Sequence, residues 1–238
     1  MTMAEHSERA KPRMTGTERR EQLIGVGRVV FAERGFEAAS VEEIAERANV
    51  SKPLIYEHFG GKEGLYAVVL DREVRLLVER IVTTMKAAEH PRGAVQGAAE
   101  AFLSYIEEHR EGFQILVRDA PIGTSSGTLP SVLGDVAASA ESVLAGHFKA
   151  RGYDPKLAPL YARGLVGMVA LVGQWWLDVG KPKRSDVVDH VVNLSWNGLK
   201  DLDPKPKYSS RGKSADAAPT KSAGKAPKGP STKKPTKN

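Results

Sequence analysis

Polar and hydrophobic positions in residues 40–48 follow a helical spacing. Ser40 precedes the apolar positions and Glu43 follows it by three residues, which is the spacing of a capping box. The apolar positions recur at intervals of three and four residues and predict one buried helix face. They are Val41, Ile44, Ala45 and Ala48. We therefore predict a short helix that begins after Ser40.

A second short helix is predicted directly after this one. Asn49 can take the left-handed backbone conformation of a tight turn, and Ser51 can cap a new helix. Pro53 lies in its first turn, where a missing N–H costs nothing. Two helices joined by so short a turn must cross steeply, as in a helix-turn-helix, which places its second helix in the major groove of DNA. The alternative is an ordinary helical hairpin.

The wider segment, residues 17–65, resembles the DNA-binding domain of the tetracycline-repressor (TetR) family of bacterial transcription regulators. The resemblance lies in the motifs FAERGF, SVEEIA, NVSK, IYEHF and GGKEGL, which occur in register. Asn49 stands where the family usually has glycine. Pro53 and Glu57 stand where small or aromatic residues are common, so they leave the operator sequence open.

The resemblance implies which residues bind DNA. Base edges are expected at the start of the second helix, at Lys52, Pro53 and Leu54. Leu54 has no hydrogen-bonding group, so it either meets a thymine methyl or only packs. Phosphate contacts are expected at Ser40, Ser51, Tyr56, His58 and Lys62. Physical support comes from helix N-termini, which attract anions, and from the hydroxyl and imidazole groups, which can donate to phosphate oxygens.

The remaining periodicity predicts an all-α fold without strands. The nine expected helices cover residues 17–35, 40–48, 51–59, 62–88, 93–109, 113–119, about 130–152, 155–177 and 185–199. Gly112 is expected to break the chain between two of them, Asp154 to cap the eighth helix and Ser185 to cap the ninth. We divide the chain into a disordered arm (1–16), a helix-turn-helix domain (17–61), a helical effector-binding and dimerisation domain (62–202) and a disordered basic tail (203–238).

The large helical domain contains candidates for two further sites. Small residues among large apolar ones let a second helix approach closely, so we assign a dimer interface, with packing inside the monomer as the alternative. Its residues are Gly164, Gly167, Ala170, Gly173, Val188, Val192 and Trp196. An effector cavity is expected among aromatic and aliphatic residues that could equally form core. They are Phe102, Tyr105, Ile106, Phe113, Leu116 and Trp175, with Arg118 for an effector head group. The run GLVGM followed by WWLD resembles family members that sense fatty-acyl or other lipid-like effectors.

Charge changes this picture at the C-terminus. The chain has a formal charge of +6, but residues 203–238 hold ten basic and two acidic side chains, so the rest is slightly acidic. Residues 1–62 hold ten of each sign, so DNA binding there depends on the placement of charges. A rival hypothesis follows from the tail, namely a nucleoid-type protein that binds any DNA sequence.

Other classes of protein receive little support. The chain has no Cys, which excludes disulfides and thiolate metal sites. Its first residues are polar, unlike a secretory signal, and its longest uncharged apolar run, 164–177, is short for a membrane span. No catalytic motif or metal-ligand spacing occurs. We expect a cytoplasmic, homodimeric transcription regulator that acts as a repressor, binds a palindromic operator and responds to a small apolar or acyl-chain-bearing effector. We expect no cofactor, metal, membrane or catalytic residue.

Overall fold

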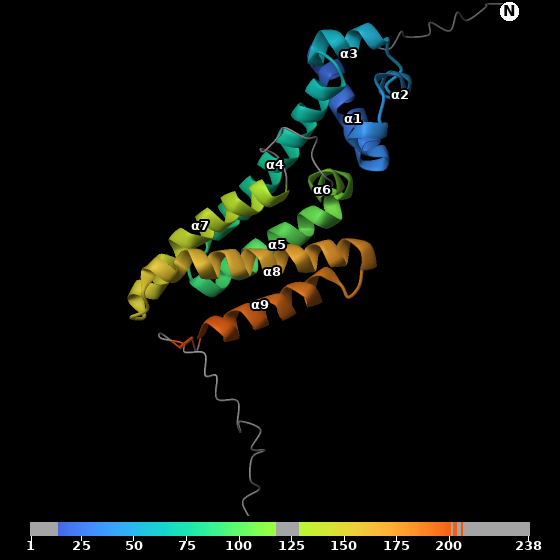
Figure 1. Cartoon of the computed structure of the whole chain (residues 1–238). Coiled ribbons are helices and arrows are strands. Elements are labelled where there is room, and N and C mark those ends of the chain that lie inside the picture. The colour runs from blue at the N-terminus through green and yellow to red at the C-terminus, as the bar shows by residue number, and fades with distance from the viewer. Residues whose placement is uncertain (1–13, 118–128, 201, 204–205, 207–238) are drawn as a thin grey trace, which may run out of the picture. The chain divides into compact units, whose positions relative to one another are not determined.

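The structure is a computed structural model that describes residues 14–117, 129–200, 202–203 and 206 (Figure 1). These residues form nine α-helices, one 3₁₀ turn and no strand, as predicted from periodicity. The helices are α1 (Gly16–Ala38), α2 (Val41–Arg47), α3 (Lys52–Phe59), α4 (Lys62–Ala87), α5 (Pro91–Glu108), α6 (Arg110–Val117), α7 (Leu129–Ala150), α8 (Ala158–Val179) and α9 (Arg184–Lys200). Most of the predicted arm, Arg118 and nearly all of the predicted basic tail lie outside the described residues.

Local signals determine where the first helices begin and end. Thr15 and Glu18 form a complete capping box at the start of α1, and Gly35, at φ 78°, interrupts this helix near its end. At Ser40 only half of the predicted box forms, because its hydroxyl accepts from the Glu43 amide while the Glu43 carboxylate binds Arg47 and Arg34 instead. Asn49 takes the left-handed conformation predicted for the turn, with φ 52°.

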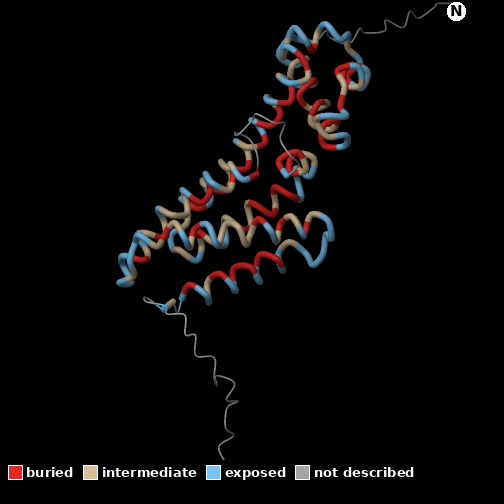
Figure 2. The backbone as a smooth tube through the Cα atoms, in the orientation of Figure 1, coloured by how far each residue is buried: buried red, intermediate tan, exposed pale blue. Residues whose placement is uncertain are grey.

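A small apolar core holds α1, α2 and α3 together. Leu23, Val30 and Phe31 from α1 are buried with Ile44 from α2 and Ile55 from α3. Figure 2 shows that buried positions alternate with exposed ones along these three helices, so each helix has a buried side and an exposed side. The start of α3, at Ser51, Lys52 and Pro53, stays exposed outside this core.

The long helix α4 carries the chain from this domain into a bundle of α5 to α9. Within the bundle α4 packs on α5, α7 on α8 and α5 on α9, whereas α6 packs back against α1. Two local predictions were wrong, because Gly112 is buried inside α6 and Ser185 lies one residue inside α9. Asp154 acts as the predicted N-cap, but the first turn after it, Pro155–Leu157, is a 3₁₀ turn that precedes α8.

A buried carboxylate joins the two parts of the described chain. Glu73 on α4 is 5% exposed and accepts a 2.7 Å hydrogen bond from the Tyr105 hydroxyl on α5. Arg28 on α1 lies 3.6 Å from its other oxygen. Burial, followed by the charge and hydrogen bond of Glu73, raises the pKa of Tyr105, so this hydroxyl stays protonated and can donate.

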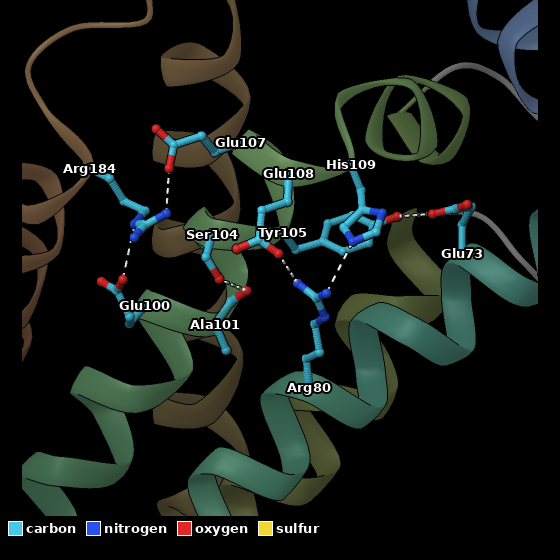
Figure 3. A network of polar contacts seen from close by, with 10 residues as sticks. All are labelled: Glu73, Arg80, Glu100, Ala101, Ser104, Tyr105, Glu107, Glu108, His109 and Arg184. Atoms are coloured by element: carbon cyan, nitrogen blue, oxygen red, sulfur yellow. Dashed lines mark hydrogen bonds and ion pairs between the residues drawn. The ribbon is translucent and has the colours of Figure 1, made fainter.

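Figure 3 shows that the polar contacts continue along α5 from this carboxylate. The ring of Tyr105 stacks on His109 at 5.1 Å, and Arg80 on α4 reaches both His109 and Glu108. Farther along, Arg184 at the start of α9 binds Glu100 and Glu107 of α5. The network therefore ties α4 and α9 to the same helix, α5.

We predict that Tyr105→Phe lowers the free energy of unfolding by about 1–3 kcal/mol, because a buried charged acceptor loses its donor. Urea unfolding followed by circular dichroism measures this. Tyr56→Phe is the matched control, since Tyr56 is 56% exposed, and should change stability by less than about 0.5 kcal/mol. Equal effects in the two variants would contradict the role of the Glu73 contact.

Candidate functional site

The exposed start of α3 gathers several of the residues predicted to bind DNA. Ser51 caps this helix without a side-chain hydrogen bond, so its hydroxyl is available to a ligand. Ser51, Lys52, Pro53 and Tyr56 are all exposed. The hydroxyl groups of Ser51 and Tyr56 and the ammonium group of Lys52 can donate hydrogen bonds to phosphate oxygens.

Lys52 is exposed but does not lack a partner. Its ammonium lies 2.7 Å from the Glu42 carboxylate of α2, and this hydrogen bond lowers the pKa of Glu42. An exposed pair of this kind is screened by water and contributes little to stability, so a phosphate can replace the carboxylate at little cost. The pair holds Lys52 beside the turn in the absence of DNA.

Other predicted contacts have structural partners. The Lys62 ammonium donates to the Phe36 carbonyl at 3.0 Å and lies 4.4 Å from the centre of the Phe36 ring, which ties α4 to the end of α1. Ser40 caps α2 through its hydroxyl, and His58 is half-buried. Leu54 is half-buried and packs against the core, so only part of its side chain can meet a thymine methyl.

An apolar cavity runs between α4, α5, α7, α8 and α9. Its volume is about 90 Å³, and its wall is almost entirely hydrocarbon. On α5 the lining positions form one stripe from Pro91 to Phe102, which corresponds to roughly 16 Å of helix. The stripe consists of Pro91, Ala94, Val95, Ala98, Ala99 and Phe102. A thin, extended apolar molecule suits a cavity of this form.

Only part of the predicted effector set lines this cavity. Phe102 lines the cavity, whereas Tyr105 does not, and its hydroxyl donates a hydrogen bond to Glu73. Ile106, Phe113 and Leu116 are buried in the core beyond the cavity's lining. Trp175 is 51% exposed and lies outside the lining, so it does not belong to this cavity.

The predicted dimer residues fall into two groups. Gly164 and Gly167 have open space where a side chain would begin. Ala170, Gly173, Val188 and Val192 are instead buried inside the monomer, and Trp196 lines the cavity. Gly173 has a packing reason to be glycine, because a Cβ there would lie 2.4 Å from the Phe102 ring. These five residues therefore pack within the monomer, which was the alternative to a dimer interface.

A different set of apolar side chains is exposed on α8 and α9, and we name it the outer face. Leu160, Leu171 and Trp175 recur on one side of α8 together with the open Gly164 and Gly167. Leu194, 64% exposed, is its counterpart on α9. Exposed apolar residues grouped in this way are typical of a protein interface.

This arrangement explains why α8 is apolar nearly all round. Within the described residues, the helical segment Pro155–Val179 is long and apolar enough to cross a membrane by length and composition alone. One side of α8 lines the cavity and the other side carries the outer face, so neither side needs polar residues. The packing of α8 against α7 and α5 fits a bundle helix.

Sequence reasoning missed most of the cavity wall. Small and aliphatic residues on α5 and α7, such as Ala98 and Val136, look like ordinary core positions in a sequence. His147 was also missed, although a histidine between Leu144 and Phe148 on an apolar helix face was a usable signal. No group of three or more His, Asp or Glu residues that could bind a metal occurs in the part of the chain that is described.

Comparison with known proteins agrees with both halves of this architecture. Residues 23–69 match the family model described as bacterial regulatory proteins, tetR family. Residues 91–198 match the model of the tetracyclin repressor-like C-terminal domain. The first match covers the helix-turn-helix and the second covers the bundle that contains the cavity.

Individual relatives extend the match. The HTH-type transcriptional activator FasR of Mycolicibacterium smegmatis is 32% identical over 192 residues, which are 79% of this chain and 85% of that protein. The HTH-type transcriptional repressor KstR2 of the same species is 30% identical over 42% of this chain and 49% of its own length.

Solved structures share the fold. A TetR-like regulator from Rhodococcus sp. RHA1 has a TM-score of 0.63 at 26% identity, covering 80% of this chain and 100% of its own. The fatty acid degradation regulator FadR of Bacillus halodurans has a TM-score of 0.62 at 21% identity, covering 75% of this chain and 98% of its own, and this likeness concerns the fold alone. With a helix-turn-helix, an apolar cavity in the bundle and a relative matched over most of its length, the chain belongs to the TetR family of bacterial regulatory proteins and is a ligand-responsive, DNA-binding transcriptional regulator.

Proposed function

We propose that this protein is a cytoplasmic homodimer that binds a two-fold symmetric operator and changes its affinity for DNA when an acyl-chain-bearing effector fills the apolar cavity. One observation carries the proposal. The cavity ends at Phe102, whose ring meets Phe113 of α6 edge to face at 5.6 Å, and α6 packs on α1 of the DNA-binding domain. The effector site therefore has a direct mechanical connection to the helix-turn-helix.

Two routes connect the cavity to α1. The first is the apolar contact from Phe102 through Phe113 to α6. The second passes along α5 from Phe102 to Tyr105, then through Glu73 to Arg28 on α1. An effector that displaces Phe102 changes both routes, because packed cores respond by discrete rearrangement and not by compression.

The outer face of α8 and α9 supports dimerisation. A second copy that covers Leu160, Leu171 and Leu194 would bury side chains that are now more than 60% exposed. Two copies would then present two recognition helices to major grooves about 34–36 Å apart, or a multiple of that distance. This is the reason to expect a two-fold symmetric operator.

Effector class follows from the hydrocarbon wall of the cavity. An apolar ligand gains about 25 cal/mol for each Å² that it removes from water. An acyl chain presents apolar surface along its whole length and so matches the apolar stripe on α5.

The sign of regulation depends on where the operator lies relative to the promoter. FasR, matched over most of its length, is named an activator, while KstR2 is named a repressor. We expected a repressor from the sequence, and the same geometry serves either outcome. We also propose that the protein has no catalytic role, because its relatives are named as transcription regulators.

Footprinting on the DNA upstream of the protein's own gene tests the proposal as a whole. The full chain should protect two half-sites related by two-fold symmetry, and dodecanoate should change the concentration needed for protection. Uniform protection of any DNA would favour the nucleoid-type alternative. A symmetric footprint that does not change with dodecanoate would contradict the proposed acyl effector but would still support a sequence-specific regulator.

We predict that Leu171→Glu converts the dimer into a monomer and lowers operator affinity at least tenfold, because the two half-sites then bind independently. Sedimentation and operator titration measure the two effects. Ala138→Glu places the same charge on an exposed position of α7 and should leave the dimer intact. If the Leu171→Glu variant remains a dimer, the outer face is not the dimer interface.

A pair of substitutions in α3 separates two kinds of DNA contact. Tyr56→Phe removes an exposed hydroxyl and should weaken binding to operator and random DNA by the same factor, because phosphate contacts carry no sequence information. Leu54→Ala should instead lower the ratio of the two affinities. Fluorescence anisotropy at fixed salt gives both ratios, and an unchanged ratio for Leu54→Ala would assign this residue to packing alone.

A further inference from the structure

The polar side chains of the cavity lie at one end of it. Its few polar members are His147 near the end of α7 and Ser195 and Trp196 near the end of α9. In Figure 1 the C-terminal ends of α4, α7 and α9 and the N-terminal end of α5 point to the same end of the bundle, away from the DNA-binding helices. A ligand in this cavity therefore meets hydrocarbon along its length and polar groups at this end.

Ser195 and His147 differ in whether their polar side-chain atoms already have a hydrogen-bond partner. The Ser195 hydroxyl already donates to the Val191 carbonyl of its own helix at 2.7 Å. The Nε2 atom of His147 is buried and has no hydrogen-bond partner among the described residues. An unpaired buried polar atom is costly, so native proteins seldom retain one without a ligand, an ion or a water to satisfy it.

The surroundings of His147 indicate what kind of group would satisfy it. Burial, and then the nearby charge of Arg151, lower the pKa of His147, so the ring is neutral near pH 7. A neutral imidazole can donate from Nε2. The positive charge of Arg151 favours an oxygen with negative or partly negative charge beside it. The Trp196 ring lies 6.1 Å from the imidazole at this end of the cavity.

We propose that His147 is the polar anchor of the effector site, where Nε2 donates a hydrogen bond to a carbonyl or carboxylate oxygen of an acyl ligand whose chain lies along α5. This inference rests on the proposed function, because it assumes that the cavity receives an effector. It adds the ligand's orientation, with the oxygen-bearing end at the ends of α7 and α9 and the chain directed toward Phe102. It also explains why a wall so uniformly apolar contains one histidine with an unused nitrogen.

The test compares three probes of equal chain length, namely dodecanoate, methyl dodecanoate and dodecane. Trp196 lines the cavity, so the tryptophan fluorescence of the full chain can report binding of each probe. His147→Phe keeps an aromatic ring and removes both nitrogens, and it should weaken the two oxygen-bearing probes about tenfold while dodecane changes less than about twofold. If the affinities for the acid and the ester fall equally, His147 contacts the carbonyl oxygen. If only the affinity for the acid falls, His147 contacts the carboxylate.

Further variants guard against trivial explanations. His147→Gln restores an N–H donor and should recover part of the preference for oxygen-bearing probes. His90→Leu removes an exposed imidazole from the same end of the bundle and should leave all three affinities unchanged. Should His147→Phe fail to fold, His147→Leu gives the same comparison without an aromatic ring.

The outcomes separate this inference from the proposed function. If the wild-type chain binds none of the three probes, the acyl-effector proposal itself is wrong. If the wild-type chain binds them and His147→Phe alters all three affinities equally, or none, the cavity is an effector site but His147 is not its anchor.

Discussion

The buried carboxylate of Glu73 is the constraint on which much of the structure depends. A carboxylate at 5% exposure needs polar partners, and here the Tyr105 hydroxyl on α5 donates to it while the Arg28 guanidinium on α1 forms an ion pair with it at 3.6 Å. Gly112 belongs to the same constraint, since a Cβ at this position would lie 2.1 Å from the Glu73 carboxylate. Four helices, α1, α4, α5 and α6, are thereby fixed around one side chain. The DNA-binding domain cannot move relative to the bundle without disturbing that side chain.

This constraint also explains where sequence reasoning succeeded and where it failed. Helices and the helix-turn-helix could be predicted because their signals are local, such as the Ser40 cap, the left-handed Asn49 and the α4 periodicity. Gly112 was read as a helix breaker because glycine usually is one. Its real reason is a carboxylate 39 residues earlier in the chain, and no local pattern contains that information.

The sites of the bundle were harder to predict for a related reason. Small residues on α8 serve two opposite purposes, since Gly173 makes room for Phe102 inside the monomer while Gly164 and Gly167 open onto the outside. Composition is the same in both cases, and only the packed partner distinguishes them. Aromatic residues likewise suggested a cavity, but most of its wall is alanine, valine and leucine, which a sequence presents as core.

The close contact between Gly173 and Phe102 gives the cavity a defined way to act at a distance. Because the α8 backbone at Gly173 approaches the Phe102 ring so closely, a ring displaced by the proposed effector would have no room to move toward α8 and would have to move on its other side. On that side it meets Phe113 of α6, and α6 rests on α1. In the proposed mechanism Gly173 would thus direct the response toward the DNA-binding helices. The proposed anchor His147, on α7, and the responding Phe102, on α5, are separate residues of the cavity lining, so each could vary independently of the other.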